Sequence, residues 1–151
     1  MKALLISIFS LIFLLGCSEC DEGFTATKIE ATTISKGQYF NTNYFAPHHG
    51  VVIYNQEEWN QFKALAWQLD EYPTETEVDF DQYIVIAAID NVHQAGGYDI
   101  QVVSVTEYSS NVVAKIAYTQ TGNFSTQITR PYHFVKILRP AKSIILKDAV
   151  F

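Results

Sequence analysis

The chain has 151 residues, which is the size of a single domain with a leader. Its 16 acidic residues outnumber its 10 Lys and Arg residues, and this acidic balance argues against a nucleic-acid partner, whose phosphates need clustered cations. Hydrophobic residues make up 48% of the chain, and this fraction is enough to pack a core.

An apolar run opens the chain. Met1 and Lys2 give a positive start, and residues 3–15 are apolar except for two serines. A helix of that length is about 20 Å long, whereas the hydrocarbon core of a membrane is about 30 Å thick and needs a helix of about 20 residues. The run therefore predicts an export signal rather than a permanent membrane span. A plain secretory signal that happens to contain a cysteine is the alternative.

The run ends in Leu14-Leu15-Gly16-Cys17, which resembles the lipobox of bacterial lipoproteins. This resemblance implies that residues 1–16 are removed as a signal peptide and that Cys17 carries the lipid. Residues 17–23 then form an acidic tether, similar to the segment that directs some Gram-negative lipoproteins to the cell surface. We expect a lipid-anchored protein of the bacterial cell envelope, on the outer membrane and exposed at its surface. With Cys17 acylated, Cys20 has no partner for an internal disulfide.

Residues 24–50 predict an N-terminal strand and a loop. Threonines in partial alternation favour a strand over residues 24–35, and residues 37–50 show no clear period. His48 and His49 lie in this loop, but adjacent residues of an extended chain point to opposite sides. The pair therefore predicts a surface feature, and no metal site is expected.

A helix is predicted after a short apolar strand at residues 51–54. Asn55 suits the N-cap position, and Glu58 follows at the spacing of a capping box. Residues 70–73 end the helix. Its apolar face comprises Trp59, Phe62, Leu65, Ala66 and Leu69.

Acidic residues then occupy every second position, at Glu75, Glu77, Asp79 and Asp81. If this segment is extended, its neighbouring carboxylates lie about 7 Å apart. Calcium needs oxygens at about 2.3–2.6 Å, so one ion would bind at most two of them. The pattern therefore predicts a solvated acidic stripe, with Val78 and Phe80 turned to the core.

Several strands follow. Residues 83–89 are almost all apolar, which predicts a central strand covered on both faces. Within residues 98–108 the apolar positions change face near Val102, which predicts either a bulge or burial of both faces at the middle of the strand. Further strands are predicted at residues 112–118, 132–138 and 144–146. One helix among mostly sequential strands predicts the α+β class, with one helix packed on a mainly antiparallel β-sheet.

Two stretches carry a family resemblance. AGGYDIQVVSV at residues 95–105 and TRPYHFVKI at residues 129–137 resemble the hallmark segments of the C-terminal domain of the protease complex subunit PrcB. The resemblance covers residues 51–146 and assigns residues 51–151 to one such domain. It implies a lipoprotein that associates with and supports a surface protease. The motif residues, which are candidate interaction residues, are Gly96, Gly97, Tyr98, Pro131, Tyr132 and His133.

Ordinary structural roles are the alternative for both motifs. Gly96 and Gly97 suit a tight turn, because glycine adopts positive φ without strain. Pro131 suits the first position of a strand. His133 should then face away from Tyr132, so that the two residues would not form one site.

No motif for catalysis is found. The sequence has no GxSxG elbow, and its two cysteines are the lipid-bearing Cys17 and Cys20 on the tether. Asp79 and Asp81 are not expected to act as a carboxylate pair. We expect a non-enzymatic interaction or accessory subunit without a cofactor, with a protein partner. The alternative is a surface lipoprotein that binds a small ligand or glycan through the aromatic residues of 38–44 and 118–124.

Overall fold

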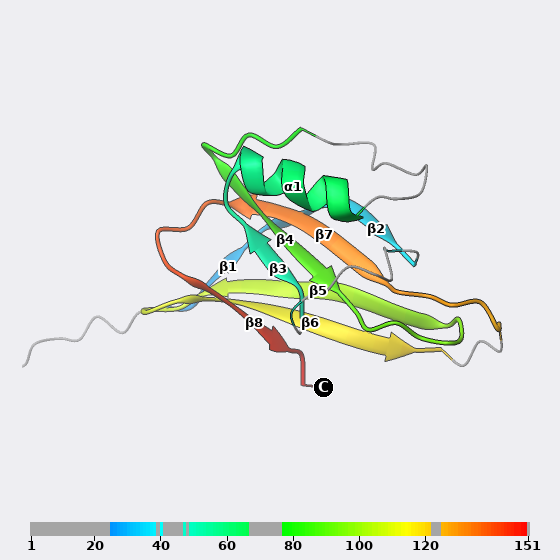
Figure 1. The fold of residues 1–151 in the computed structure, drawn as a ribbon. Helices are drawn as coiled ribbons and strands as arrows, with labels where there is room; N and C mark the ends of the chain where they lie inside the picture. The colour runs from blue at the N-terminus through cyan, green and yellow to red at the C-terminus, as the bar shows by residue number, and fades with distance from the viewer. Residues whose placement is uncertain are drawn as a thin grey trace, which may run out of the picture.

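The computed structural model describes residues 25–38, 40, 47, 49–66, 77–121 and 125–150, and within them the chain forms three layers (Figure 1). The elements are β1 (Thr27–Ile29), β2 (Ala31–Gly37), β3 (Val51–Ile53), α1 (Gln56–Ala66), β4 (Tyr83–Ile89), β5 (Tyr98–Glu107), β6 (Val112–Gln120), β7 (Tyr132–Leu138) and β8 (Ile144–Asp148). Sheet A has the strand order β1-β5-β6-β8, and sheet B has the order β2-β7-β4-β3. Helix α1 covers the face of sheet B that points away from sheet A.

The predicted α+β class is confirmed. Every strand pair in the two sheets is antiparallel except β6 with β8, which is parallel. The single strand predicted over residues 24–35 is instead two strands. β1 pairs with β5 in sheet A, and after Glu30 the chain enters sheet B, where β2 pairs with β7. This crossing joins the two sheets along one side.

Strand β4 is buried on both faces, as predicted. Three of its side chains pack between the two sheets, and the three that alternate with them pack beneath the helix. The first set is Ile84, Ile86 and Ala88, and the second is Val85, Ala87 and Ile89. A strand with no solvent-exposed face is typical of the interior of a sheet, and β4 lies between β7 and β3.

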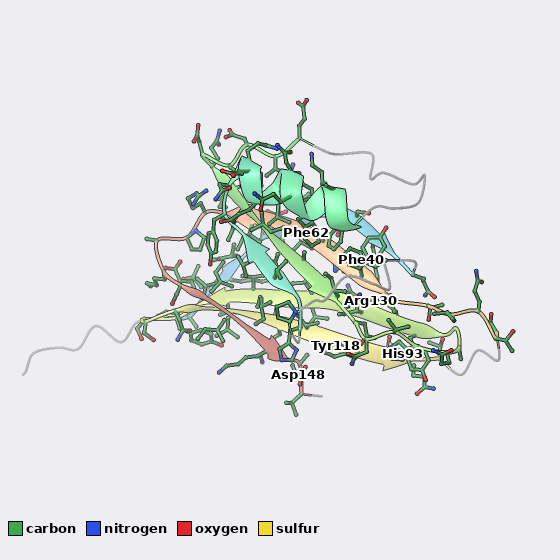
Figure 2. All side chains as sticks on the ribbon, viewed as in Figure 1. Phe40, Phe62, His93, Tyr118, Arg130 and Asp148 are labelled. Carbon is green, nitrogen blue, oxygen red and sulfur yellow. The ribbon has the colours of Figure 1, made fainter. Side chains whose placement is uncertain are left out.

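Aromatic rings fill the space between the helix and sheet B. Trp59 is fully buried, and its ring stacks on Phe62 with centroids 5.7 Å apart. Phe134 of β7 meets Phe62 edge-on at 5.3 Å, and Phe40 lies 5.9 Å from both Phe62 and Phe134 (Figure 2). Such pairs add to the free energy gained by burial alone.

The predicted helix start is confirmed. Asn55 Oδ1 accepts a hydrogen bond from the Glu58 amide at 2.8 Å. The Glu58 carboxylate returns to the amide of Tyr54, one residue earlier than in a standard capping box. The side chains of Leu65 and Ala66, together with Leu69 and the predicted helix end at residues 70–73, lie outside the described residues.

Local predictions in the strands also hold. The register of β5 against β6 shifts between Val102 and Ser104, which is the predicted bulge. Gly97 has φ of +83°, as a tight turn requires.

Of the acidic stripe, Glu77, Asp79 and Asp81 are exposed as predicted. The chain is not extended there, because Asp79 closes a turn by accepting hydrogen bonds from the Asp81 amide and the Gln82 side chain.

Replacement of Trp59 by Ala should remove the central ring of the helix-side core. We expect the free energy of unfolding to fall by about 3–5 kcal/mol, because the cavity adds to the lost burial. Denaturant unfolding measures this value. Gln61→Ala on the exposed side of α1 is the matched control and should change stability by less than about 0.5 kcal/mol. Similar losses in both variants would contradict the packing described.

Candidate functional site

The two hallmark stretches meet at one end of the sandwich. The loop at residues 90–97 follows β4, and residues 125–131 precede β7. His93 and Thr129 form an antiparallel bridge, with hydrogen bonds of 2.8 and 2.9 Å between their backbones. The Asp90 amide also donates to the carbonyl of Pro131 at 2.9 Å. We call these two bonded segments the loop pair.

Gly96, Gly97 and Tyr98 are built into the loop pair. The Gly96 amide donates to the Ser125 carbonyl at 3.1 Å, and the Gly97 carbonyl accepts from the Thr121 amide at 2.7 Å. The Tyr98 carbonyl accepts from the Gln38 side chain at 3.0 Å. The predicted turn role of the glycines thus serves to hold the loops together.

Asp90 is the acidic centre of the loop pair. It is the first residue after the buried strand β4, and only 7% of it is exposed. One carboxylate oxygen accepts from the Asn91 amide at 2.7 Å, and the other lies 2.9 Å from His93 Nε2. The His93 ring stacks on Tyr98, with centroids 3.6 Å apart and planes 6° from parallel. Asp90 therefore fixes His93 through a charge-assisted contact.

Arg130 brings a positive charge to the same place. Its side chain is buried, and its Nε donates to the Asp90 carbonyl at 3.0 Å. The guanidinium carbon lies 5.5 Å from the centre of the Phe40 ring, within the range of a cation–π contact. Figure 2 places Arg130, Tyr118 and His93 at the end toward which the arrows of β4 and β6 point. Arg130 is thus bonded to the backbone of Asp90, the residue whose carboxylate holds His93.

A small cavity of about 110 Å³ opens next to this cluster. His49 Nδ1 lies 2.9 Å from the Tyr118 hydroxyl and 3.2 Å from an Asp148 carboxylate oxygen. Burial raises the pKa of Tyr118, and the charges of Asp148 and Asp90 raise it further. The phenol therefore keeps its proton at neutral pH. The cavity is lined by Pro47, His49, Ile89, Asp90, Asn91, Tyr118 and Arg130.

The cavity can hold a small polar group. Ordinary ligand pockets measure about 300–1,000 Å³, so this volume suits a few water molecules or one small group rather than a sugar ring. A phenol held in its protonated form donates hydrogen bonds and does not act as a base. Three of the five aromatic residues proposed for glycan binding in 38–44 and 118–124 lie outside the described residues, so that alternative stays a prediction.

Pro131, Tyr132 and His133 occupy the start of β7, and Pro131 is buried just before the strand. Tyr132 and His133 face opposite ways, as predicted. Tyr132 packs against the helix-side core, whereas His133 is 4% exposed and points between the sheets. Their part in an interaction stays a prediction.

His133 replaces a missing strand partner for β5. β1 pairs with β5 only as far as Ile29, so the Val102 amide has no neighbouring strand on that side. His133 Nδ1 accepts from this amide at 3.0 Å, and its Nε2 lies 2.9 Å from the Thr33 hydroxyl. An accepting Nδ1 requires the neutral ring with the proton on Nε2. Burial, with a smaller contribution from Lys36, lowers the pKa of His133 to about 4.

Sequence reasoning missed the main polar residues of this end. Asp90 and His93 come from the loop after β4, Tyr118 comes from β6 and Arg130 from the segment before β7, and only the fold brings these three segments together. Two signals were present, since Asp90 directly follows a buried strand and Arg130 directly precedes the Pro-Tyr-His motif. Within the described residues, no three His, Cys, Asp or Glu side chains are grouped to hold a metal ion. Cys17 lies outside the described part of the chain.

Comparison with protein-family models, curated proteins and solved structures gives no match. The resemblance to the PrcB C-terminal domain family therefore stays a prediction, as does the lipid anchor. In the part of the chain that the structure describes, no helix is long and apolar enough to cross a membrane.

The buried neutral His133 predicts a loss of stability in acid. The unfolded chain binds a proton near pH 6.5, whereas the folded ring does so only near pH 4. The contribution of His133 to the free energy of unfolding should therefore fall by about 2–3 kcal/mol as the pH drops from 6.5 to 4. Thermal or denaturant unfolding between pH 7 and pH 4 measures the slope.

His133→Asn keeps an acceptor for the Val102 amide but cannot titrate. We expect it to flatten the slope between pH 6.5 and pH 4 relative to the unmodified chain. Thr33→Val, which removes the other contact and leaves the imidazole in place, should retain the slope. An unchanged slope in His133→Asn would show that His133 is not the titrating group.

Proposed function

We propose that this chain is a lipid-anchored, non-enzymatic binding subunit of the bacterial cell envelope. Its proposed partner is a surface protein, and a protease is the leading candidate. The lipobox-like residues supply the anchor, and the PrcB-like motifs supply the type of partner. The structural observation that carries the proposal is the loop pair. It holds both motifs in one hydrogen-bonded unit and exposes Val92 (39%) and Ile128 (49%) at its surface.

The loop pair is suited to binding because it is ordered before a partner arrives. Binding residues often lie on loops that a rigid scaffold positions. Here the His93–Thr129 bridge and the bonds from Gly96 and Gly97 fix the loops, so that contact with a partner requires little further ordering. Exposed aliphatic side chains on such a surface are the groups that a protein partner buries.

The polar contacts at this end favour binding over catalysis. Asp90 is saturated by Asn91 and His93, and Tyr118 remains protonated. In the described part of the chain, every buried side-chain nitrogen or oxygen has a hydrogen-bond partner. Groups that stabilise one another in this way make the loops rigid.

The tether limits where the folded part can be. Thr25, where the described chain begins, is the eighth residue after Cys17. A fully extended chain covers about 3.5 Å per residue, so the fold must start within roughly 30 Å of the lipid. The proposed partner must therefore also be at the membrane.

Cys17→Ser tests the anchor. It removes the thiol that accepts the lipid, so we expect the chain to lose fatty-acid labelling and to move from the membrane fraction to the soluble fraction. Cys20→Ser is the matched control and should behave like the unmodified chain. Equal membrane retention in both variants, with no fatty acid on the unmodified protein, would refute the proposed anchor.

Val92→Asp combined with Ile128→Asp tests the loop pair. Two buried charges in an interface cost several kcal/mol, so cross-linking in intact cells should recover at least tenfold less partner. Leu138→Asp is the control, since Leu138 is 60% exposed but lies at the other end of β7. All three substitutions are at exposed positions and should leave the melting temperature nearly unchanged. Equal recovery from both variants would place the partner elsewhere.

A further inference from the structure

The outer face of sheet A, which points away from sheet B, differs in charge from the rest of the molecule. Alternate residues of its strands pack into the core between the sheets, so the residues between them point outward. These outward residues are not part of the two core clusters, and of those on the face only Val113 is buried, with 8% of it exposed. The outer face is defined by Lys28 on β1, Thr106 on β5, Val113 and Lys115 on β6, and Ile145 and Lys147 on β8.

The three lysines of this face have no partner within the described residues. The other six described cations each have an intramolecular contact: Lys36 with Asp99, Lys142 with Glu107, Arg130 and Arg139 with backbone carbonyls, Lys63 over Trp59 and Lys136 over Tyr83. In the described part of the chain, the ammonium groups without an intramolecular contact thus all lie on one face. This segregation is notable because the chain as a whole carries a net charge of −6.

Two of these lysines are direct neighbours. Lys115 of β6 and Lys147 of β8 are partners in the parallel register, so their strands are about 4.8 Å apart at that point. Like charges placed opposite one another destabilise a sheet. Asp148 follows Lys147 on β8, but its carboxylate lies 3.2 Å from His49 Nδ1, and successive side chains of a strand point to opposite faces. An anion outside the molecule would relieve this repulsion.

The shape and composition of the face favour a lipid surface over a protein. Lysine is depleted in protein interfaces, whereas each lysine near an anionic membrane gains about 1 kcal/mol. Ile145 is 38% exposed next to Lys147 on this face, and an apolar side chain on a lipid-bound surface can insert where headgroups meet acyl chains. Lys28 is also only eleven residues after Cys17, within about 40 Å of the proposed anchor.

We propose that the outer face of sheet A lies on the anionic lipid headgroups of the membrane that carries the chain. This inference rests on the proposed lipid anchor and adds an orientation to it. The acids of the tether are repelled by the same headgroups, so the lysines determine which side of the fold faces the lipid. Helix α1 then points away from the membrane, and the loop pair at the end of the sandwich stays accessible to a partner.

Lysine labelling on vesicles tests this orientation. The chain purified from its own membranes is incorporated into phosphatidylcholine vesicles with or without phosphatidylglycerol, treated with an amine-reactive reagent and digested for mass spectrometry. Lys28, Lys115 and Lys147 should be labelled roughly threefold more slowly when phosphatidylglycerol is present, because headgroup contact shields them. Lys63 and Lys136 on the helix side should react equally on both vesicles.

A charge-matched pair of variants sharpens the test. Lys115→Gln with Lys147→Gln should abolish the phosphatidylglycerol-dependent protection of Lys28, whereas Lys63→Gln with Lys136→Gln should leave it intact. Identical labelling of the face on both vesicle types would overturn the proposal. Protection that depends on a co-purified protein and not on phosphatidylglycerol would also overturn it.

The same digest separates this inference from the anchor. The mass of the peptide containing Cys17 reports whether lipid is attached. An unlipidated Cys17 together with lipid-dependent protection refutes the anchor and supports the face. A lipidated Cys17 without protection supports the anchor and refutes the face.

Discussion

β4 is a strand with no face open to water, and this constraint organises the molecule. Each fully buried Val or Ile side chain contributes about 1.5–3 kcal/mol, so both faces of β4 require a complete covering layer. Sheet A covers one face with aliphatic side chains, and helix α1 covers the other with aromatic rings. Asp90 follows immediately after this strand, so a fixed position in the core leads directly into the loop pair.

Buried polar groups make the architecture specific. Asp90, Arg130 and His133 are each at most 7% exposed, and each is bonded to a segment distant in sequence. His133 reaches from β7 to the amide of Val102, so it joins sheet B to sheet A where β1 has left the edge of β5. In a low-dielectric interior an unpaired polar group would be costly, so these contacts favour one register of the sheets over shifted ones. The rigidity proposed for the loop pair has the same origin.

Structural features that depend on neighbouring residues could be predicted from the sequence, whereas contacts between distant segments could not. The apolar run at 83–89, the cap at Asn55, the bulge near Val102 and the turn at Gly97 each follow from a few neighbouring residues, and all are present. The division into two sheets was missed because it depends on Glu30, where the chain leaves β5 for β7, and no pattern in residues 24–35 marks that point. The grouping of Asp90 with Arg130 and Tyr118 was missed for a similar reason, since it requires the ends of β4 and β6 to be adjacent.

The parallel pairing of β6 with β8 has a consequence for biogenesis. Neighbouring antiparallel strands such as β5 and β6 can pair as soon as both have emerged, but β6 gains its second partner only after β7 and residues 144–148 have followed. During synthesis the β6 edge, with its row of valine, alanine and isoleucine, therefore stays open to other extended chains until β8 docks on it.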